Sequence, residues 1–288
     1  MKKHWSLKPA TSAVLAGALL GCAFVVNAAL PVAAGGPSTC SFSGGEVRVE
    51  LEQDDSSGTL TLDNLGVAIL YNDDGPPAAA EPCETATVSN TNKIVVEDVS
   101  DGGSSGIILD LLNGPFADGG AEIPIEIDLG SGPLDTFAVL GSTGADFWTF
   151  GSEGANLQQD SAAEIEFVRQ PDLGLGSLRG GNDRACANGG RGTEITSQLT
   201  WLFSGGADDD RLCGGFVTDQ LLGETGSDVL RGNGGIDTLK GGKDGDRLFG
   251  NASNDVLYGN EGSDELNGGP GSDVCKGGAG NDQKTHCE

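Results

Sequence analysis

The sequence predicts an all-β protein whose C-terminal part is a parallel β-roll. Residues 205–285 divide into nine consecutive blocks of nine residues with no break in register. The first place of every block is Gly, the sixth is Asp, and the eighth is Leu in the first seven blocks. Before this segment, short apolar or alternating runs are separated by turn sequences, and no amphipathic helix of useful length appears.

Each repeated residue type suits one position in a stacked coil. Glycine permits the left-handed backbone conformations that a six-residue turn needs. The eighth place lies in a strand too short to direct more than one side chain into a shared core. A disordered glycine-rich linker would not keep leucine in phase with aspartate. We therefore expect a core of stacked leucines, namely Leu212, Leu221, Leu230, Leu239, Leu248, Leu257 and Leu266.

The sixth-place aspartates predict calcium sites between successive turns. Two blocks make one coil, so residues 18 apart would stack on the same edge, with strands about 4.8 Å apart. Calcium takes oxygen ligands at about 2.3–2.6 Å, which facing carboxylates and turn carbonyls can supply. We expect at most seven inter-turn sites, formed by stacked pairs of Asp210, Asp219, Asp228, Asp237, Asp246, Asp255, Asp264, Asp273 and Asp282.

These blocks resemble the RTX, or hemolysin-type, calcium-binding repeat, whose consensus is G-G-x-G-x-D-x-U-x. The blocks GGPGSDVCK and GGAGNDQKT follow it closely, apart from the apolar place of the second. In GGFVTDQLL and GNASNDVLY, Val217 and Ser253 replace the fourth-place glycine. The resemblance covers residues 205–285 and implies a β-roll that binds Ca²⁺. Together with an export signal and the Cys40/Cys83 pair nearer the N-terminus, this layout resembles that of secreted bacterial calcium-binding proteins.

The charge of the chain limits its partners. The formal net charge is −27, and beyond residue 34 the chain has 43 acidic residues against 13 basic ones. Nucleic acid and anionic membranes are therefore poor partners. Without calcium the stacked carboxylates would repel one another, so we expect folding of the roll to be coupled to binding. We expect dissociation constants on the order of 10⁻⁴–10⁻³ M, as in extracellular calcium modules.

Residues 1–34 predict an export signal. Three lysines near the start precede an apolar run over residues 14–26, and a small-residue cleavage site precedes Gly35. A transmembrane span is the alternative, but the apolar run is short for a bilayer. The sequence Leu-Leu-Gly-Cys ending at Cys22 also permits a lipid anchor. Either signal predicts a protein that is secreted or held at the cell surface.

The six remaining cysteines predict disulfides, because an exported chain meets an oxidising compartment. The sequence alone allows many connectivities. A metal–thiolate cluster is the alternative, but no C-x-x-C spacing occurs. Sequence proximity favours the pairs Cys40 with Cys83, Cys186 with Cys213, and Cys275 with Cys287.

We divide the chain into a signal peptide (1–34), an N-terminal β-rich domain (35–130), a degenerate repeat segment with an inserted loop (131–204) and the roll (205–288). The second region fits either a β-sandwich or the opening coils of a solenoid. In the third, GSTGADFWT and LRGGNDRAC place Asp146 and Asp183 at the aspartate position. Strands are expected at residues 46–51, 59–63, 67–71, 93–97, 107–112, 122–129 and 164–168.

The residue inventory argues against catalysis. After the signal, the chain has no histidine before His286, so nucleophile–histidine systems and H-E-x-x-H zinc sites are missing. The G-x-S-x-G match at residues 102–106 is not followed by a helix and is better explained as a glycine-rich turn. Two carboxylates suffice for a glycosidase, so a polysaccharide-acting enzyme using acids within residues 35–204 stays open. We predict a non-catalytic structural or interaction role, with a glycan or protein partner outside the cell.

Overall fold

The computed structural model contains only β-strands, turns and loops in the part of the chain that it describes. The predicted signal, Cys22, most of the G-x-S-x-G segment and the core of the inserted loop lie outside that part. No helix able to cross a membrane occurs within it. The described residues are 39–51, 57–62, 68–72, 81–99, 105–111, 117–118, 121–130, 135–150, 154–157, 165–167, 171–187 and 200–288.

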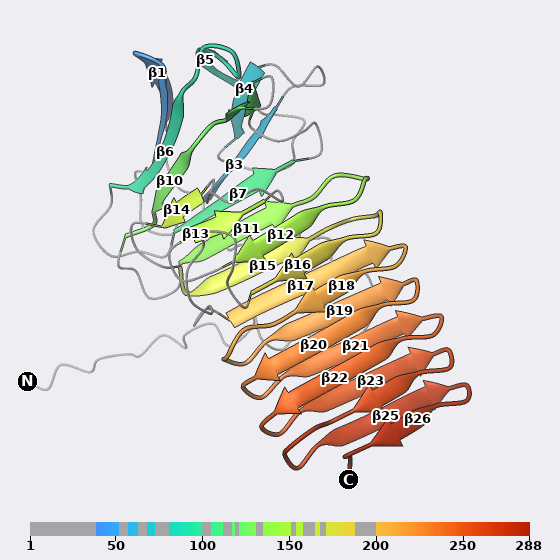
Figure 1. The fold of residues 1–288 in the computed structure, drawn as a ribbon. Helices are drawn as coiled ribbons and strands as arrows, with labels where there is room; N and C mark the ends of the chain where they lie inside the picture. Colours follow the sequence, from blue (N-terminus) through green and yellow to red (C-terminus); the bar gives the residue numbers. More distant parts are fainter. Residues whose placement is uncertain are drawn as a thin grey trace, which may run out of the picture.

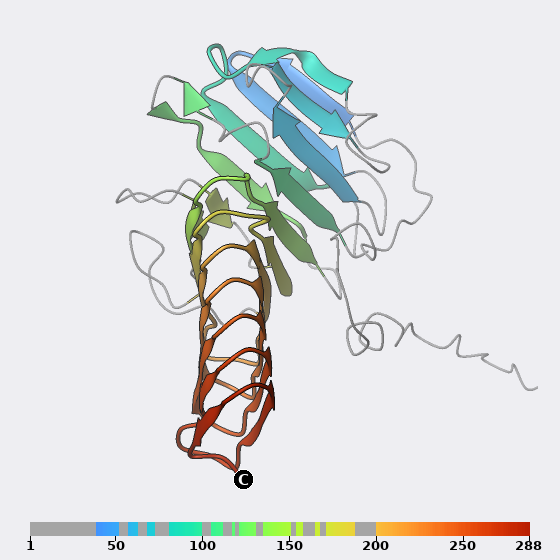
Figure 2. The same cartoon turned by 90° about the vertical axis from the view of Figure 1, so that its right-hand side faces the viewer.

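Two long sheets run through the molecule and face each other across the core (Figures 1 and 2). Sheet A has the strand order β1 (Thr39–Ser43), β2 (Glu46–Leu51), β6 (Lys93–Asp98), β10 (Ile125–Asp128), β14 (Ile165–Phe167), β13 (Gly154–Asn156), β12 (Phe147–Phe150), β16 (Arg184–Cys186), β18 (Arg211–Cys213), β20 (Val229–Gly234), β22 (Arg247–Ala252), β24 (Glu265–Asn267) and β26 (Gln283–Thr285).

Sheet B contains the strands that alternate with these along the chain. Its order is β5 (Glu81–Thr87), β4 (Ala68–Asn72), β3 (Ser57–Leu62), β7 (Gly106–Asp110), β11 (Thr136–Leu140), β15 (Leu173–Ser177), β17 (Thr200–Ala207), β19 (Gln220–Thr225), β21 (Thr238–Lys243), β23 (Val256–Glu261) and β25 (Val274–Ala279). A separate small hairpin joins β8 (Ala117–Asp118) to β9 (Ala121–Glu122).

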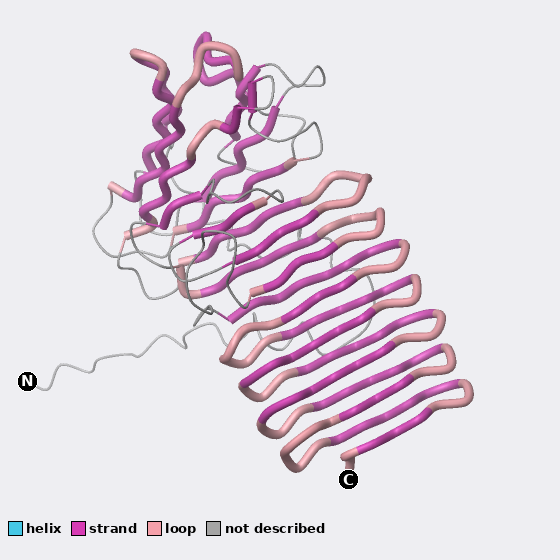
Figure 3. Tube along the Cα trace, in the orientation of Figure 1, coloured by secondary structure: helices cyan, strands magenta, loops and turns pink. Residues whose placement is uncertain are grey.

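The C-terminal part is the expected parallel β-roll. Each strand pairs in parallel with the strand two elements later, so that residues 18 apart are neighbours. The expected leucine core is confirmed, because all seven leucines are fully buried. They form one column on each sheet, and Cys275 ends the column on sheet B. The tube in Figure 3 shows strands on the two faces and loops confined to the two edges.

The N-terminal part continues the same coil. Parallel pairs link β2 to β6 and β10, and β3 to β7 and β11, so the solenoid alternative describes it better than a sandwich. Antiparallel strands occur at its outer end, in β1, β4 and β5, and around β13. Six of the expected strands lie within two residues of their predicted bounds, and the one expected at 122–129 divides into β9 and β10 around Pro124.

Strand β15 was missed because its sequence, LGLGS, is poor in strand-forming residues. The structure gives the reason for its glycines. A Cβ at Gly174 would collide with the ring of Trp201 on the next turn, and one at Gly176 would lie 2.9 Å from an atom of the Phe203 ring. Trp201 and Phe203 stack with 4.9 Å between ring centroids, and both are fully buried. Trp201 and Phe203 therefore belong to the core between the two sheets.

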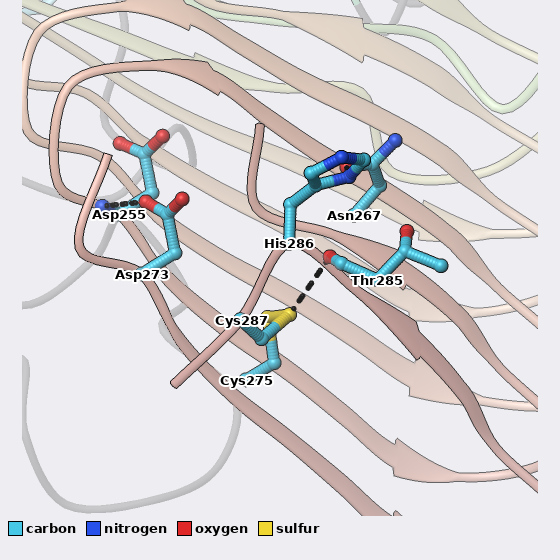
Figure 4. Close-up of a disulfide and its surroundings, with 7 residues drawn as sticks. All are labelled: Asp255, Asn267, Asp273, Cys275, Thr285, His286 and Cys287. Atoms are coloured by element: carbon cyan, nitrogen blue, oxygen red, sulfur yellow. Dashed lines mark hydrogen bonds between the residues drawn. A yellow bond between two sulfur atoms is a disulfide. The ribbon is translucent and has the colours of Figure 1, made fainter. Parts of the chain in front are cut away.

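All three favoured disulfides are present. Cys40–Cys83 ties β1 to β5 and therefore joins the two sheets at the N-terminal end. Cys186–Cys213 links the neighbouring strands β16 and β18. Cys275–Cys287 fastens the last residues to β25, as Figure 4 shows. The bridges therefore fasten both ends of the described coil and one pair of neighbouring turns between them.

Candidate metal sites along the turn edges

The turns of the roll require left-handed backbone at two places of most blocks. At the fourth place φ is +77° at Asp208, +72° at Asp244 and +90° at Ser253, where other blocks have glycine. At the second place, Asn233 and Asn251 have φ of +73° and +69°. Glycine and asparagine tolerate this region best, which explains their frequency at these places.

The sixth-place aspartates stack along both edges as expected. The backbone N–H of each donates a hydrogen bond of 2.8–3.2 Å to Oδ1 of the aspartate 18 residues later. Figure 4 shows the bond between Asp255 and Asp273. These bonds join all seven expected pairs: Asp210–Asp228, Asp219–Asp237, Asp228–Asp246, Asp237–Asp255, Asp246–Asp264, Asp255–Asp273 and Asp264–Asp282.

The carboxyl groups point inward rather than lying at the turn edge. From Asp210 to Asp273 these eight residues are at most 2% exposed, and Asp282 is half-buried. For seven of them the second oxygen, Oδ2, is buried and makes no hydrogen bond within the described residues. Asp219 differs, because its Oδ2 accepts the N–H of Gly215 at 2.7 Å. A buried carboxylate oxygen without a partner is costly, so a cation is the natural complement of these atoms.

The first-place glycine allows a carboxylate oxygen and a carbonyl oxygen of the next turn to approach its backbone closely. A Cβ at Gly232 would lie inside contact distance of Oδ2 of Asp237 and 2.7 Å from the carbonyl oxygen of Gly250. The same convergence of a carboxylate oxygen and the carbonyl of the next turn recurs at Gly205, Gly214, Gly223, Gly250 and Gly259. The backbone at these places is not left-handed, so clearance is the reason that the first place is always glycine.

The ligand chemistry fits calcium. No group of three or more His, Cys, Asp or Glu side chains able to hold a metal occurs in the described part of the chain. A site must therefore combine aspartate Oδ2 with backbone carbonyl oxygens of two turns. Hard oxygen donors of this kind, in a flexible number, are what Ca²⁺ prefers.

Comparison with known families agrees with this geometry. Residues 202–221, 222–257 and 249–283 match the family model described as the RTX calcium-binding nonapeptide repeat (4 copies). Residues 202–283 are RTX repeats. RTX repeats bind calcium, so Ca²⁺ is the ion that this segment of the protein takes. Neither a curated protein nor a solved structure matches the chain.

Burial makes the carboxyl groups of the RTX repeats hard to ionise without a bound cation. It raises the pKa above the ordinary 3.8 in the seven aspartates from Asp210 to Asp264, and neighbouring carboxylates raise it further in most of these. The pKa reaches about 8 for Asp210 and Asp237, about 7 for Asp246, and about 6 for Asp219, Asp228 and Asp255. A divalent cation at Oδ2 would reverse this effect.

The aspartate stack extends beyond the RTX repeats. The N–H of Asp146 donates to Oδ1 of Asp183 at 2.7 Å, and the N–H of Asp183 donates to Oδ1 of Asp210 at 2.9 Å. Neither residue was among the expected ligands. The Oδ2 of Asp183 is also buried without a partner within the described residues, but Leu178 stands where the repeats have their first-place glycine. Leu178 therefore has a Cβ where the first place of each RTX block has none.

In the coils before the RTX repeats, an arginine side chain provides a positive charge between successive turns. The guanidinium of Arg179 donates to Oδ1 of Asp110 at 2.9 Å and to the carbonyl oxygen of Gly141 at 2.6 Å. It therefore joins a carboxylate and a turn carbonyl of successive coils, as an ion would between RTX turns. Sequence reasoning did not identify Arg179, although a lone arginine at the second place of a worn repeat was a visible signal.

Proposed function

We propose that this chain is an exported, non-catalytic calcium-binding protein whose RTX repeats fold when Ca²⁺ enters between their turns. The observation that carries the proposal is the column of buried Oδ2 atoms without a hydrogen-bond partner within the described residues, most of which lie, together with a carbonyl oxygen of the next turn, close to a first-place glycine. Without the ion, ionising these carboxylates opposes folding. With it, binding free energy becomes folding free energy.

We assign the calcium ligands to the aspartates of the nine blocks and to carbonyl oxygens of the stacked turns. The assignment gives Oδ1 a structural role in every stacked pair, because it accepts a backbone N–H. Oδ2 is then the atom that contacts the ion. Asp219 would contribute least, since its Oδ2 already accepts the Gly215 N–H. The ligand residues are Asp210, Asp219, Asp228, Asp237, Asp246, Asp255, Asp264, Asp273 and Asp282.

Export and domain organisation belong to the same proposal. The signal-like residues 1–34 and three disulfides both suit an extracellular location. Millimolar calcium outside the cell would match weak sites of the extracellular type. In this scheme the segments 35–130 and 131–204, together called the front, are stabilised by disulfides and by an internal cation. Residues 205–288 fold afterwards, when they bind calcium outside the cell.

The test compares the mature full-length chain in chelator and in millimolar calcium. We expect strand content by circular dichroism, and protection of residues 205–288 from protease, to appear together as calcium is added. The Asp246→Asn and Asp255→Asn double variant should raise the calcium midpoint without affecting the front. If strand content and protection are the same in chelator and in calcium, folding is not coupled to the ion and the proposal is wrong.

An enzyme acting on extracellular polysaccharide is the alternative. Two buried acids in the front hold structural contacts instead of facing a substrate site. Asp110 binds Arg179, and Asp135 Oδ1 accepts the N–H of Ser105 at 3.0 Å. A screen of the purified protein for turnover of glycans distinguishes this enzyme from a non-catalytic protein. Turnover that a single Asp or Glu substitution within residues 35–204 abolishes would establish the enzyme.

A further inference from the structure

The outer face of sheet A in the roll carries positive charge on an otherwise acidic protein. Arg184, Arg211, Arg231 and Arg247 are all exposed there. Arg184 and Arg211 are direct neighbours in register. The only acid at an outward position of strands β16 to β26 of this sheet is Glu265, which pairs with Arg247 at 3.0 Å. Four arginines thus lie on the outer face of this sheet, while the chain as a whole has a net charge of −27.

A cavity lies beside this charge. It has a volume of about 510 Å³ and is lined by Phe249, Asn251, Asn267, Pro270 and His286, among others. The guanidinium carbons of Arg231 and Arg247 lie 5.0 and 5.5 Å from the centroid of the Phe249 ring. Two cationic groups therefore border the aromatic wall of the cavity.

The polar wall is held in place by the end of the chain. Nδ1 of His286 lies 3.1 Å from Oδ1 of Asn267, and the next residue, Cys287, is bridged to Cys275 (Figure 4). Asn251 donates its amide to the carbonyl of Phe249 at 3.2 Å. Each asparagine is oriented by one hydrogen bond, and its other amide atom has no partner within the described residues. An amide donor and an amide acceptor therefore remain for a ligand.

We propose that this cavity and its arginines bind an anionic saccharide. A sugar ring packs its apolar face on Phe249, its hydroxyls exchange hydrogen bonds with Asn251 and Asn267, and its carboxylate meets the guanidiniums of Arg231 and Arg247. Guanidinium groups suit carboxylates because their planar donors match two oxygens. The proposal goes beyond calcium binding and requires only that the roll be folded.

The other anionic macromolecules fit this face less well. The net charge of −27 opposes every anionic ligand, and it opposes double-stranded nucleic acid and anionic membranes most strongly because their charge density is highest. They also need a stripe of basic residues, whereas here the charge adjoins a single aromatic ring and neutral amides. A hydroxyl-rich ligand with one carboxylate per unit uses all of these groups.

The experiment is isothermal titration of the mature chain, in saturating calcium, with a short galacturonic acid oligomer and with a galactose oligomer of equal length. We expect the acidic oligomer to bind at least about tenfold more tightly than the neutral one. Arg231→Gln with Arg247→Gln should remove that preference. Phe249→Ala should weaken the binding of both oligomers, and Phe249→Leu, which keeps an apolar side chain but removes the aromatic ring, should weaken it as well.

The matched control is Lys240→Gln with Lys276→Gln, which removes two positive charges beside an aromatic ring on sheet B. This control should bind as the unsubstituted chain does. Circular dichroism in calcium verifies that every variant is folded. The proposal is overturned if the folded chain binds neither oligomer, if the control loses as much affinity as the arginine variant, or if a single-stranded oligonucleotide of equal charge binds more tightly than the acidic oligomer.

Discussion

Replacing the first-place glycine of one RTX block should block a single calcium site. In Gly232→Ala the added Cβ would lie 2.7 Å from the carbonyl oxygen of Gly250 and inside contact distance of Asp237 Oδ2. Ordinary contacts of a Cβ begin near 3.4 Å, so two ligand oxygens must move by several tenths of an ångström. Overpacking of this size costs about 1–3 kcal/mol.

The cost should appear only in calcium. We expect Gly232→Ala to lower the free energy of unfolding in saturating calcium by about 1–3 kcal/mol and to raise the calcium midpoint about tenfold. Titration calorimetry should count one bound ion fewer. In chelator, where the turn is not formed, the variant should match the unsubstituted chain.

Gly180→Ala is the matched control. Its backbone is not left-handed, and a Cβ there would meet only Ala207, at 3.7 Å from the nearest atom. The calcium midpoint of this variant should not change. If Gly232→Ala keeps the original midpoint and the original number of bound ions, the space beside the first-place glycine is not the calcium site.

Three further outcomes follow from the same structure. Leu239→Ala removes a fully buried side chain from the sheet B column and should lower the free energy of unfolding in calcium by about 2–5 kcal/mol, measured by thermal denaturation. Arg179→Met leaves the buried Asp110 carboxylate without its cation and should destabilise the front by about 3–5 kcal/mol even in chelator, while the calcium midpoint stays constant in titrations. The third concerns pH. Because burial raises the pKa of Asp210 and Asp237 from 3.8 to about 8, the folded calcium-free roll binds more protons than the unfolded chain. Folding of the calcium-free roll should therefore be most favourable near pH 4 and become less favourable as the pH rises to about 8, while calcium affinity rises over the same window. Circular dichroism in chelator and calcium titrations at several pH values check both trends.

Much of the roll could be predicted because each place of the block has one environment. The eighth-place leucines lie in the core and the second and fourth places turn left-handed, so a single period revealed the register, the stacking partners and the glycine-rich turns. Two of the disulfides followed from sequence proximity, because they join residues of the same coil or of neighbouring coils.

The front could be predicted only in part. Alternating residues identified strands such as β2 and β6, but alternation reports which face a side chain occupies and not which strand lies beside it. The choice between sandwich and solenoid depended on parallel pairs between residues far apart, such as Val47 with Ile94. The need for glycine in β15 is explained only by the tertiary structure, in which Trp201 and Phe203 lie directly against these glycines.

The sequence by itself determined the nine-residue period, the pairs of aspartates that stack and the ion that suits them. Only the tertiary structure decided how each carboxyl group is used. One oxygen accepts an N–H from the preceding turn, and the other is buried beside a glycine that faces a carbonyl of the following turn. The different roles of the two oxygens depend on the distance between turns 18 residues apart. The stacking of strands within the sheets sets that distance, so it cannot be read from the sequence of a single block.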